Sequence, residues 1–243
     1  MVIMKLNVKI YRYKPGTEPH YDTFPVEVPE TANVLDAIER AWADHDMSIM
    51  FRHACHHASC GSCGLLVNDQ EKLPCVTPVT DYGDGATLKI DPMRNMPVIT
   101  DIAVDASVIY QRMQLIGMPI IRNAETLRPD GTEPLPDGLE SFGRFENCLE
   151  CGLCLSACPV MATDPQFLGP MTLAAAERLL AEPRGVDVER IYQLLDDEHG
   201  VWRCHSSFEC TEACPYEVDP GGAIMRLKRK VGARKIKRFF GGS

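Results

Sequence analysis

The stretch Cys148-Leu-Glu-Cys151-Gly-Leu-Cys154-Leu-Ser-Ala-Cys158-Pro159 contains four cysteines separated by two, two and three residues, with a proline after the last. This spacing is typical of chains in which three cysteines of one run hold an iron–sulfur cluster and the fourth binds a second cluster. The sequence should therefore contain another run that completes both clusters.

The second run is Cys204-His-Ser-Ser207-Phe-Glu-Cys210-Thr-Glu-Ala-Cys214-Pro215, which has a serine where its second cysteine is expected. Because the last cysteine of each run binds the other cluster, one predicted ligand set is Cys148, Cys151, Cys154 and Cys214. The other predicted set is Cys158, Cys204 and Cys210. A serine hydroxyl holds iron weakly, so the sequence predicts a 4Fe-4S cluster in the first set and a 3Fe-4S cluster in the second. We expect the three-cysteine site to have the higher reduction potential.

A third group of cysteines, Cys55-His-His-Ala-Ser-Cys60-Gly-Ser-Cys63 with a distant Cys75, has the plant-type 2Fe-2S spacing. Gly61 and Gly64 suit a loop that wraps closely around inorganic sulfide, because glycine adds no side chain and accepts positive φ. Three nearby histidines offer an alternative in which two imidazoles replace two thiolates; these are His53, His56 and His57. Four cysteines already fill the site, so we expect the histidines to be exposed to water instead.

Zinc binding and disulfide formation are two further roles that cysteines can have. Structural zinc sites use four ligands in two pairs rather than runs of three that end in Cys-Pro, and eleven cysteines is an odd number for a fully paired disulfide framework. Thiolates at ligand spacings suggest a reducing compartment. At 243 residues with 45% hydrophobic side chains, the chain is long enough for two globular domains.

The periodicity predicts an α+β domain followed by a mostly helical one. Alternating residues predict strands, and residues repeating at three and four positions predict helices. The expected strands are 5–13, 24–28, 65–67 and 87–90. The expected helices are 33–44, 102–116, 172–181, 188–195 and a last one from Ala223, with a turn-rich connection over 122–140. Prolines between 92 and 97 suggest domains of residues 1–97 and 98–243.

Basic residues are concentrated near the end of a chain whose net charge is −9. Residues 226–238 contain eight lysines and arginines and no acid. Such a segment can be a solvated helix face, a surface that meets anionic lipid or a membrane subunit, or a nucleic-acid arm; we rank these in that order and expect no nucleic-acid partner. We also expect neither a membrane-spanning segment nor a signal peptide.

These motifs together resemble the iron–sulfur subunit of succinate dehydrogenase or fumarate reductase, respiratory complex II. The matching elements span the chain and are Cys60-Gly-Ser-Cys63-Gly, Cys158-Pro159, Phe167-Leu-Gly-Pro170, Gly200-Val-Trp202, Cys204-His205 and Cys214-Pro215. The resemblance implies a β-grasp 2Fe-2S ferredoxin domain and an all-α helical ferredoxin domain. It implies a non-flavin subunit of the tricarboxylic acid cycle enzyme succinate:quinone oxidoreductase, with electrons passing singly between FAD and quinone.

The resemblance also implies partners and a location. FAD is expected in a separate flavoprotein subunit, and quinone at the interface with a membrane anchor subunit. The subunit is expected to be peripheral, at the cytoplasmic face of the bacterial inner membrane. Pro159 and His205 match residues beside the quinone; for His205 a hydrogen bond to cluster sulfur is the alternative. Ubiquinone-reducing members carry a tryptophan shortly after the Cys-Pro, and its absence from Val160–Thr163 favours fumarate-reductase-like or menaquinone-linked relatives.

Two other functions are compatible with the motifs. The chain could be the iron–sulfur subunit of another flavin-linked oxidoreductase built on the same domains, or a zinc-stabilised scaffold protein. No Gly-x-Gly-x-x-Gly fingerprint and no nucleophile–base pair occurs in the sequence, so neither a dinucleotide site nor catalytic residues are expected in this chain.

Overall fold

The computed structural model describes residues 2–118, 145–182 and 186–241. The predicted connection over 122–140 lies outside these residues. Contacts divide the chain into two compact units, which are Met1–Ala106 with Leu149–Ala157, and Ser107–Cys148 with Cys158–Ser243. The first cysteine run is thus shared between the units, although it is continuous in sequence. The domain boundary between residues 97 and 98 stays a prediction.

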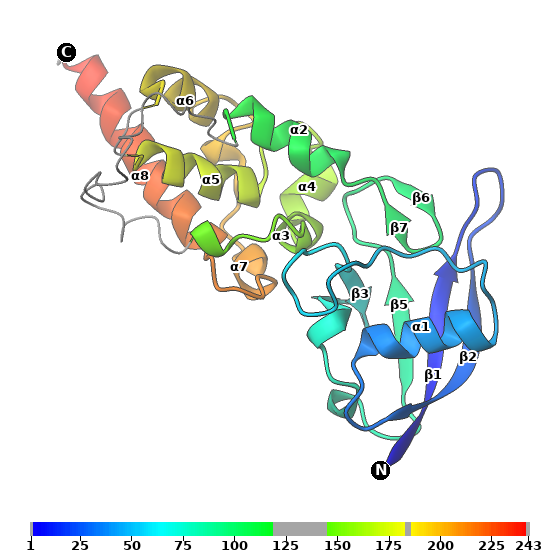
Figure 1. Cartoon of the computed structure of the whole chain (residues 1–243). Coiled ribbons are helices and arrows are strands. Elements are labelled where there is room, and N and C mark those ends of the chain that lie inside the picture. The colour runs from blue at the N-terminus through cyan, green and yellow to red at the C-terminus, as the bar shows by residue number, and fades with distance from the viewer. Residues whose placement is uncertain (1, 119–144, 183–185, 242–243) are drawn as a thin grey trace, which may run out of the picture. The chain divides into compact units, whose positions relative to one another are not determined.

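The first unit contains a five-stranded sheet with the order β2-β1-β5-β3-β4. The strands are β1 (Ile3–Arg12), β2 (His20–Pro29), β3 (Leu65–Val67), β4 (Gln70–Lys72) and β5 (Thr87–Asp91). The predicted hairpin is confirmed, because β1 pairs antiparallel with β2, and β5 lies parallel to β1 on its other side. Helix α1 (Val34–Asp44) packs against β1 and β2 (Figure 1). This is the mixed sheet and crossing helix expected of a β-grasp domain.

The residues that form these elements bury the faces that their periodicity predicts. Leu6, Val8 and Ile10 of β1 are buried while the residues between them are not. Helix α1 begins after Asn33, whose backbone N–H donates to the Asp36 carboxylate at 2.7 Å. This contact satisfies one of the amides left unpaired at a helix start and orients the helix over the sheet.

One predicted helix begins later than its sequence pattern indicates. We expected a helix over 102–116, but Ala103–Val104 form strand β7, which pairs with β6 (Val98–Thr100), and α2 covers Ser107–Leu115. The reason lies in Asp101, which is 1% exposed and accepts hydrogen bonds from the backbone N–H of Tyr13 and of Met50. These bonds tie the segment to the sheet, so tertiary contacts override its helical periodicity.

Arg12 pairs with Asp101 at 3.2 Å and also reaches Asp22 and Asp46, while only 6% exposed. We expect Arg12→Ala to lower the stability of the first unit by about 3–5 kcal/mol, because it leaves a buried carboxylate without its cation. The melting temperature of the cluster-loaded chain measures this. Lys5→Ala, which removes an exposed ion pair with Glu27, should cost at most about 1 kcal/mol. Equal melting temperatures for Arg12→Ala and Lys5→Ala would contradict the role of Arg12 as the cation that neutralises the buried Asp101 carboxylate.

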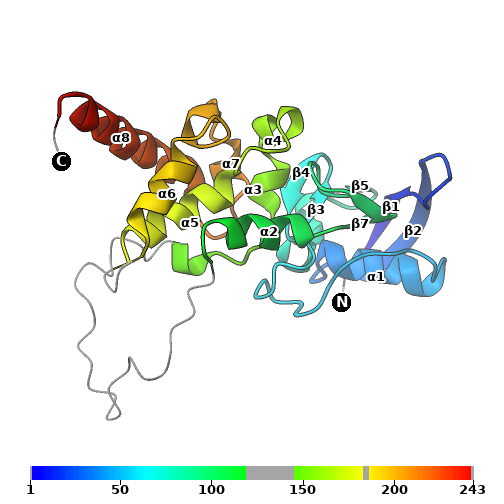
Figure 2. The same ribbon diagram turned by 90° about the horizontal axis from the view of Figure 1, so that it is seen from above.

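The described residues of the second unit form helices and no strand. They are α2, α4 (Pro159–Thr163), α5 (Pro170–Leu180), α6 (Val188–Leu195), α7 (Glu209–Glu212) and α8 (Pro220–Phe239). Helix α5 lies at the centre beside α8 and α6 (Figures 1 and 2), and its Leu173, Ala175 and Ala176 are completely buried. The expected all-α second domain is confirmed.

Candidate metal centres

The loop between α1 and β3 carries Cys55, Cys60 and Cys63 of the predicted 2Fe-2S site, and Cys75 lies beyond β4 in the short turn Pro74–Val76. The Sγ atoms of Cys63 and Cys75 lie 3.4 Å apart, and the Sγ of Cys55 accepts the backbone N–H of Cys60 at 3.3 Å. Further backbone N–H groups point at sulfur, from Ser59 to Cys55 at 3.2 Å and from Ser62 to Cys60 at 3.5 Å. Such amide donors stabilise thiolate charge. The sequence alone did not reveal them, because backbone direction is not encoded in spacing.

The thiols of this loop differ in their protonation chemistry. Burial raises the pKa of Cys63 to about 12, and its neighbour Cys75 is also buried. In contrast, hydrogen bonding from the backbone of His57 lowers the pKa of Cys55 to about 6. Buried thiols become thiolates only with a cation to compensate their charge. The contact between the Cys63 and Cys75 sulfurs and the backbone amides directed at Cys55 and Cys60 therefore form a donor set that fits a 2Fe-2S cluster.

The segment Leu149–Ala157, which includes α3 (Leu153–Ser156), packs against this loop. A Cβ atom on Gly61 would lie 2.7 Å from Cys151 Cβ and 2.9 Å from Cys151 Cα. The Asn95 side-chain amide donates to the carbonyls of Leu155 and Ser156 at 2.9 and 3.0 Å. The part of the first cysteine run around Cys151 is thereby held against the 2Fe-2S loop, at a distance from Gly61 that leaves no room for a Cβ atom.

The second unit gathers the predicted three-cysteine set. Cys158 precedes α4, Cys204 follows the short turn Val201–Arg203, and Cys210 lies in α7. Burial, together with the nearby sulfurs of Cys158 and Cys204, raises the pKa of Cys210 to about 12. Burial likewise raises the pKa of Cys158. The buried thiols of Cys158 and Cys210 therefore need a compensating cation to ionise, and their interaction with Cys204 fits an iron–sulfur cluster.

The two cysteine runs share one backbone pattern. In the first run Glu150 and Gly152 have positive φ, at 52° and 81°, and in the second Ser206 and Phe208 do, at 60° and 65°. Both pairs fall two and four residues after the first cysteine of their run. The exposed Ser207 thus occupies the loop position that Cys151 occupies in the first run.

The structure leaves the predicted four-cysteine set untested, because it draws on both units. Cys151 and Cys154 belong to the first unit, while Cys148 and Cys214 belong to the second. The quinone candidates Pro159 and His205 are both exposed in the second unit. The set and the quinone candidates therefore remain predictions.

Comparison with known proteins agrees with this arrangement of cysteines. Residues 7–111 match the family model of the 2Fe-2S iron-sulfur cluster binding domain, and residues 144–218 match that of the 4Fe-4S dicluster domain. The chain is also 34% identical over 236 residues to the fumarate reductase iron-sulfur subunit of Haemophilus influenzae, covering 92% of this chain and 91% of the relative. The chain belongs to the iron–sulfur subunits of fumarate reductase and succinate dehydrogenase.

Two further matches place this iron–sulfur subunit in the same family. It is 34% identical to the fumarate reductase iron-sulfur subunit of Mycobacterium tuberculosis, over 97% of this chain and 96% of the relative. It superposes on a chain of the Mycobacterium smegmatis Sdh1 complex in the apo form with a TM-score of 0.85 and 25% identity, covering 97% of this chain and 98% of that one. The protein is an electron-transfer subunit of a complex II-type enzyme.

The basic residues of α8 in the iron–sulfur subunit are largely engaged within the second unit. Arg226 and Lys230 pair with Glu177 of α5 at 2.7 and 3.6 Å, and Lys235 pairs with Asp196 at 2.8 Å. These contacts favour the solvated, intramolecularly paired helix face among the three interpretations of the basic segment. No helix among the described residues is long and apolar enough to cross a bilayer.

One cation of α8 has a contact that the sequence did not indicate. Lys228 Nζ donates to the carbonyl oxygen of Cys204 at 2.7 Å and lies 3.3 Å from Ser206 Oγ. If Cys204 binds a cluster as predicted, this positive charge would favour the reduced, more negative state of the centre. Nothing in the sequence distinguishes Lys228 from the seven other cations of the segment, so only the fold reveals it.

Proposed function

We propose that this iron–sulfur subunit passes electrons one at a time between the FAD of a flavoprotein subunit and a membrane quinone. The observation that carries the proposal is the gathering of thiols into separate groups, with four sulfurs in the Cys55–Cys75 loop and three in the second unit. Bound iron–sulfur clusters supply reversible one-electron chemistry. The residues of this chain hold those centres, exclude water from them and set their potentials through amides and charges.

The proposed ligands are the eleven cysteines in three sets. For 2Fe-2S they are Cys55, Cys60, Cys63 and Cys75. For 4Fe-4S they are Cys148, Cys151, Cys154 and Cys214. For 3Fe-4S they are Cys158, Cys204 and Cys210. The contact of Cys151 with Gly61 supports direct exchange between the first two sets, since it holds a ligand of one against the loop of the other.

The proposed partners follow from the family. We place the subunit at the cytoplasmic face of the inner membrane, between a flavoprotein subunit and a membrane anchor, with Pro159 and His205 nearest the quinone. Their exposure supports this role, because a residue that contacts a ligand from outside the chain must be accessible. Residues 160–163, which follow Pro159, contain no tryptophan, whereas ubiquinone-reducing relatives carry one a few residues after the Cys-Pro; this favours a fumarate-reductase-like or menaquinone-linked enzyme.

Metal analysis of the native complex tests the cluster assignment. We expect about nine iron atoms and about ten sulfides per copy of this chain. EPR spectra should show three distinguishable signals, one of which is present when the protein is oxidised. Succinate-dependent dye reduction by the same preparation would separate this function from that of another flavin-linked oxidoreductase. A colourless preparation that contains zinc would refute the proposal.

A further inference from the structure

Two histidines and a glutamate converge beside the 2Fe-2S loop. His53 Nδ1 and His56 Nε2 lie 3.0 Å apart, and Glu39 Oε1 lies 3.3 Å from the first and 3.4 Å from the second. These three atoms are the potential ligands of one metal ion. Glu39 comes from α1, whereas both histidines come from the chain just before and after Cys55, so the fold joins two separate segments at this point.

The spacing of the three atoms matches a metal coordination sphere. Zinc binds histidine nitrogen and carboxylate oxygen at about 2.0–2.2 Å, so two ligands at the tetrahedral angle lie about 3.3 Å apart. Both distances from Glu39 Oε1 agree with this value. The two imidazole nitrogens are somewhat closer, because without a metal they share a hydrogen bond. Two histidines, a glutamate and an open fourth position also form a ligand set that zinc uses in proteins.

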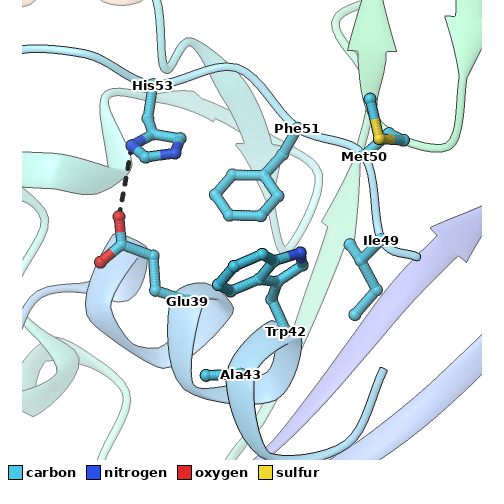
Figure 3. Close-up of a pocket in the computed structure, with 7 residues that line it drawn as sticks. All are labelled: Glu39, Trp42, Ala43, Ile49, Met50, Phe51 and His53. Atoms are coloured by element: carbon cyan, nitrogen blue, oxygen red, sulfur yellow. Dashed lines mark ion pairs between the residues drawn. The ribbon is translucent and has the colours of Figure 1, made fainter. Parts of the chain in front are cut away.

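The chain holds these side chains in place before any ion binds. The His53 ring stacks on Phe51 at 5.0 Å between centroids, with 20° between the planes, and Figure 3 shows Glu39 directed at this ring from α1. His56 has a positive φ of 59°, which turns its ring back toward His53. Because these side chains are already ordered, metal binding would cost little side-chain conformational entropy.

The position of Glu39 Oε1 calls for a cation. This oxygen is inaccessible to solvent and accepts no hydrogen bond from the described residues, and the two imidazole nitrogens lie beside it at ion-pair distance. A buried carboxylate oxygen without a donor is costly, and a coordinated cation would remove that cost. By contrast His57, the third histidine of the loop, points elsewhere and hydrogen-bonds to the Cys55 carbonyl.

We propose that Glu39, His53 and His56 form a binding site for a divalent transition-metal ion, with zinc as its best-fitting ion and water as the fourth ligand. The site is distinct from the iron–sulfur centres because none of its ligands is a cysteine. A bound ion would cross-link α1 to both sides of Cys55 and stiffen the loop. The proposal does not depend on the function proposed above, since it concerns nitrogen and oxygen ligands alone.

Zinc titration of the full chain with its iron–sulfur clusters tests the site. We expect one zinc ion per chain by calorimetry, with iron content unchanged after binding. His53→Ala and His56→Ala should each weaken zinc binding by more than about tenfold, since even changes outside the coordination sphere cost about 10–100-fold. Glu39→Gln should weaken it in the same direction. His57→Ala, in the same loop, should bind zinc as the unmodified chain does.

X-ray absorption at the zinc edge identifies the ligands directly. The proposal requires nitrogen and oxygen at about 2.0–2.2 Å and no sulfur, which zinc binds at about 2.3 Å. Sulfur in the zinc spectrum together with iron loss would show that zinc enters a cluster site, and would overturn the proposal. Absence of zinc binding, or equal affinity in all four variants, would equally overturn it and would show that the two histidines and Glu39 form only a hydrogen-bonded and ionic contact.

Discussion

Ser207→Cys is expected to convert the proposed 3Fe-4S centre of the second unit into a 4Fe-4S cluster and to lower its reduction potential. The backbone supports this outcome, because Ser207 lies between Ser206 and Phe208, whose positive φ values repeat the pattern around Cys151. A thiolate at this position completes a fourth iron corner and adds negative charge. The EPR signal of the oxidised centre should disappear, and quinone reduction should become slower.

A neighbouring substitution provides the control for the cluster conversion. Ser206→Cys also adds a thiol to the loop but places it one residue away from the position that matches Cys151. The EPR signal of the oxidised centre should therefore persist in the Ser206→Cys variant. If Ser207→Cys keeps that signal with full iron content, the set of Cys158, Cys204 and Cys210 is wrongly assigned.

Gly61→Ala is expected to separate the Leu149–Ala157 segment from the 2Fe-2S loop. The added Cβ would lie 2.9 Å from the Cα of Cys151, so backbone as well as side chain must move, and the position has a φ of +67°. Overpacking costs about 1–3 kcal/mol and the left-handed backbone about 1–2 kcal/mol. Amide hydrogen exchange in the segment should accelerate at least about tenfold, since about 1.4 kcal/mol is a factor of ten.

Gly85→Ala provides the control, because it carries the backbone cost without the steric clash. The difference between the two variants is the steric part of the effect. Gly85 also has a positive φ, at 78°, but nothing lies within 4 Å of the Cβ that alanine would add. Its cost should be only the backbone term of about 1–2 kcal/mol, without faster exchange in Leu149–Ala157. Similar exchange in both variants would mean that the segment does not dock on Gly61.

The sequence says more about which cysteines group together than about what surrounds them. Because cysteine spacing follows cluster geometry, the groups around Cys55 and around Cys158 could be proposed as ligand sets before any fold was known. The hydrogen bonds to their sulfurs could not, because they depend on backbone direction at residues such as Ser59. Lys228 was hidden for a different reason, since one lysine among eight neighbouring cations carries no local signal.

The secondary structure was predictable where local periodicity and tertiary contacts agree. The bounds of α6 (Val188–Leu195) are as predicted, and Asn33 begins α1 through the expected partner Asp36. The prediction was wrong at 102–106, where the buried Asp101 binds backbone amides from distant segments. Strand β4 was missed because its residues Gln70, Glu71 and Lys72 are all polar, so no apolar face marks it as a strand.

The matching left-handed residues of the two cysteine runs bear on how such a redox centre can evolve. The second run keeps the chain path of a four-thiolate loop although one of its side chains is a serine. That side chain is exposed, so its identity is not constrained by packing. A change at this one codon should therefore shift the electrochemistry of the proposed centre while the fold around it stays unchanged.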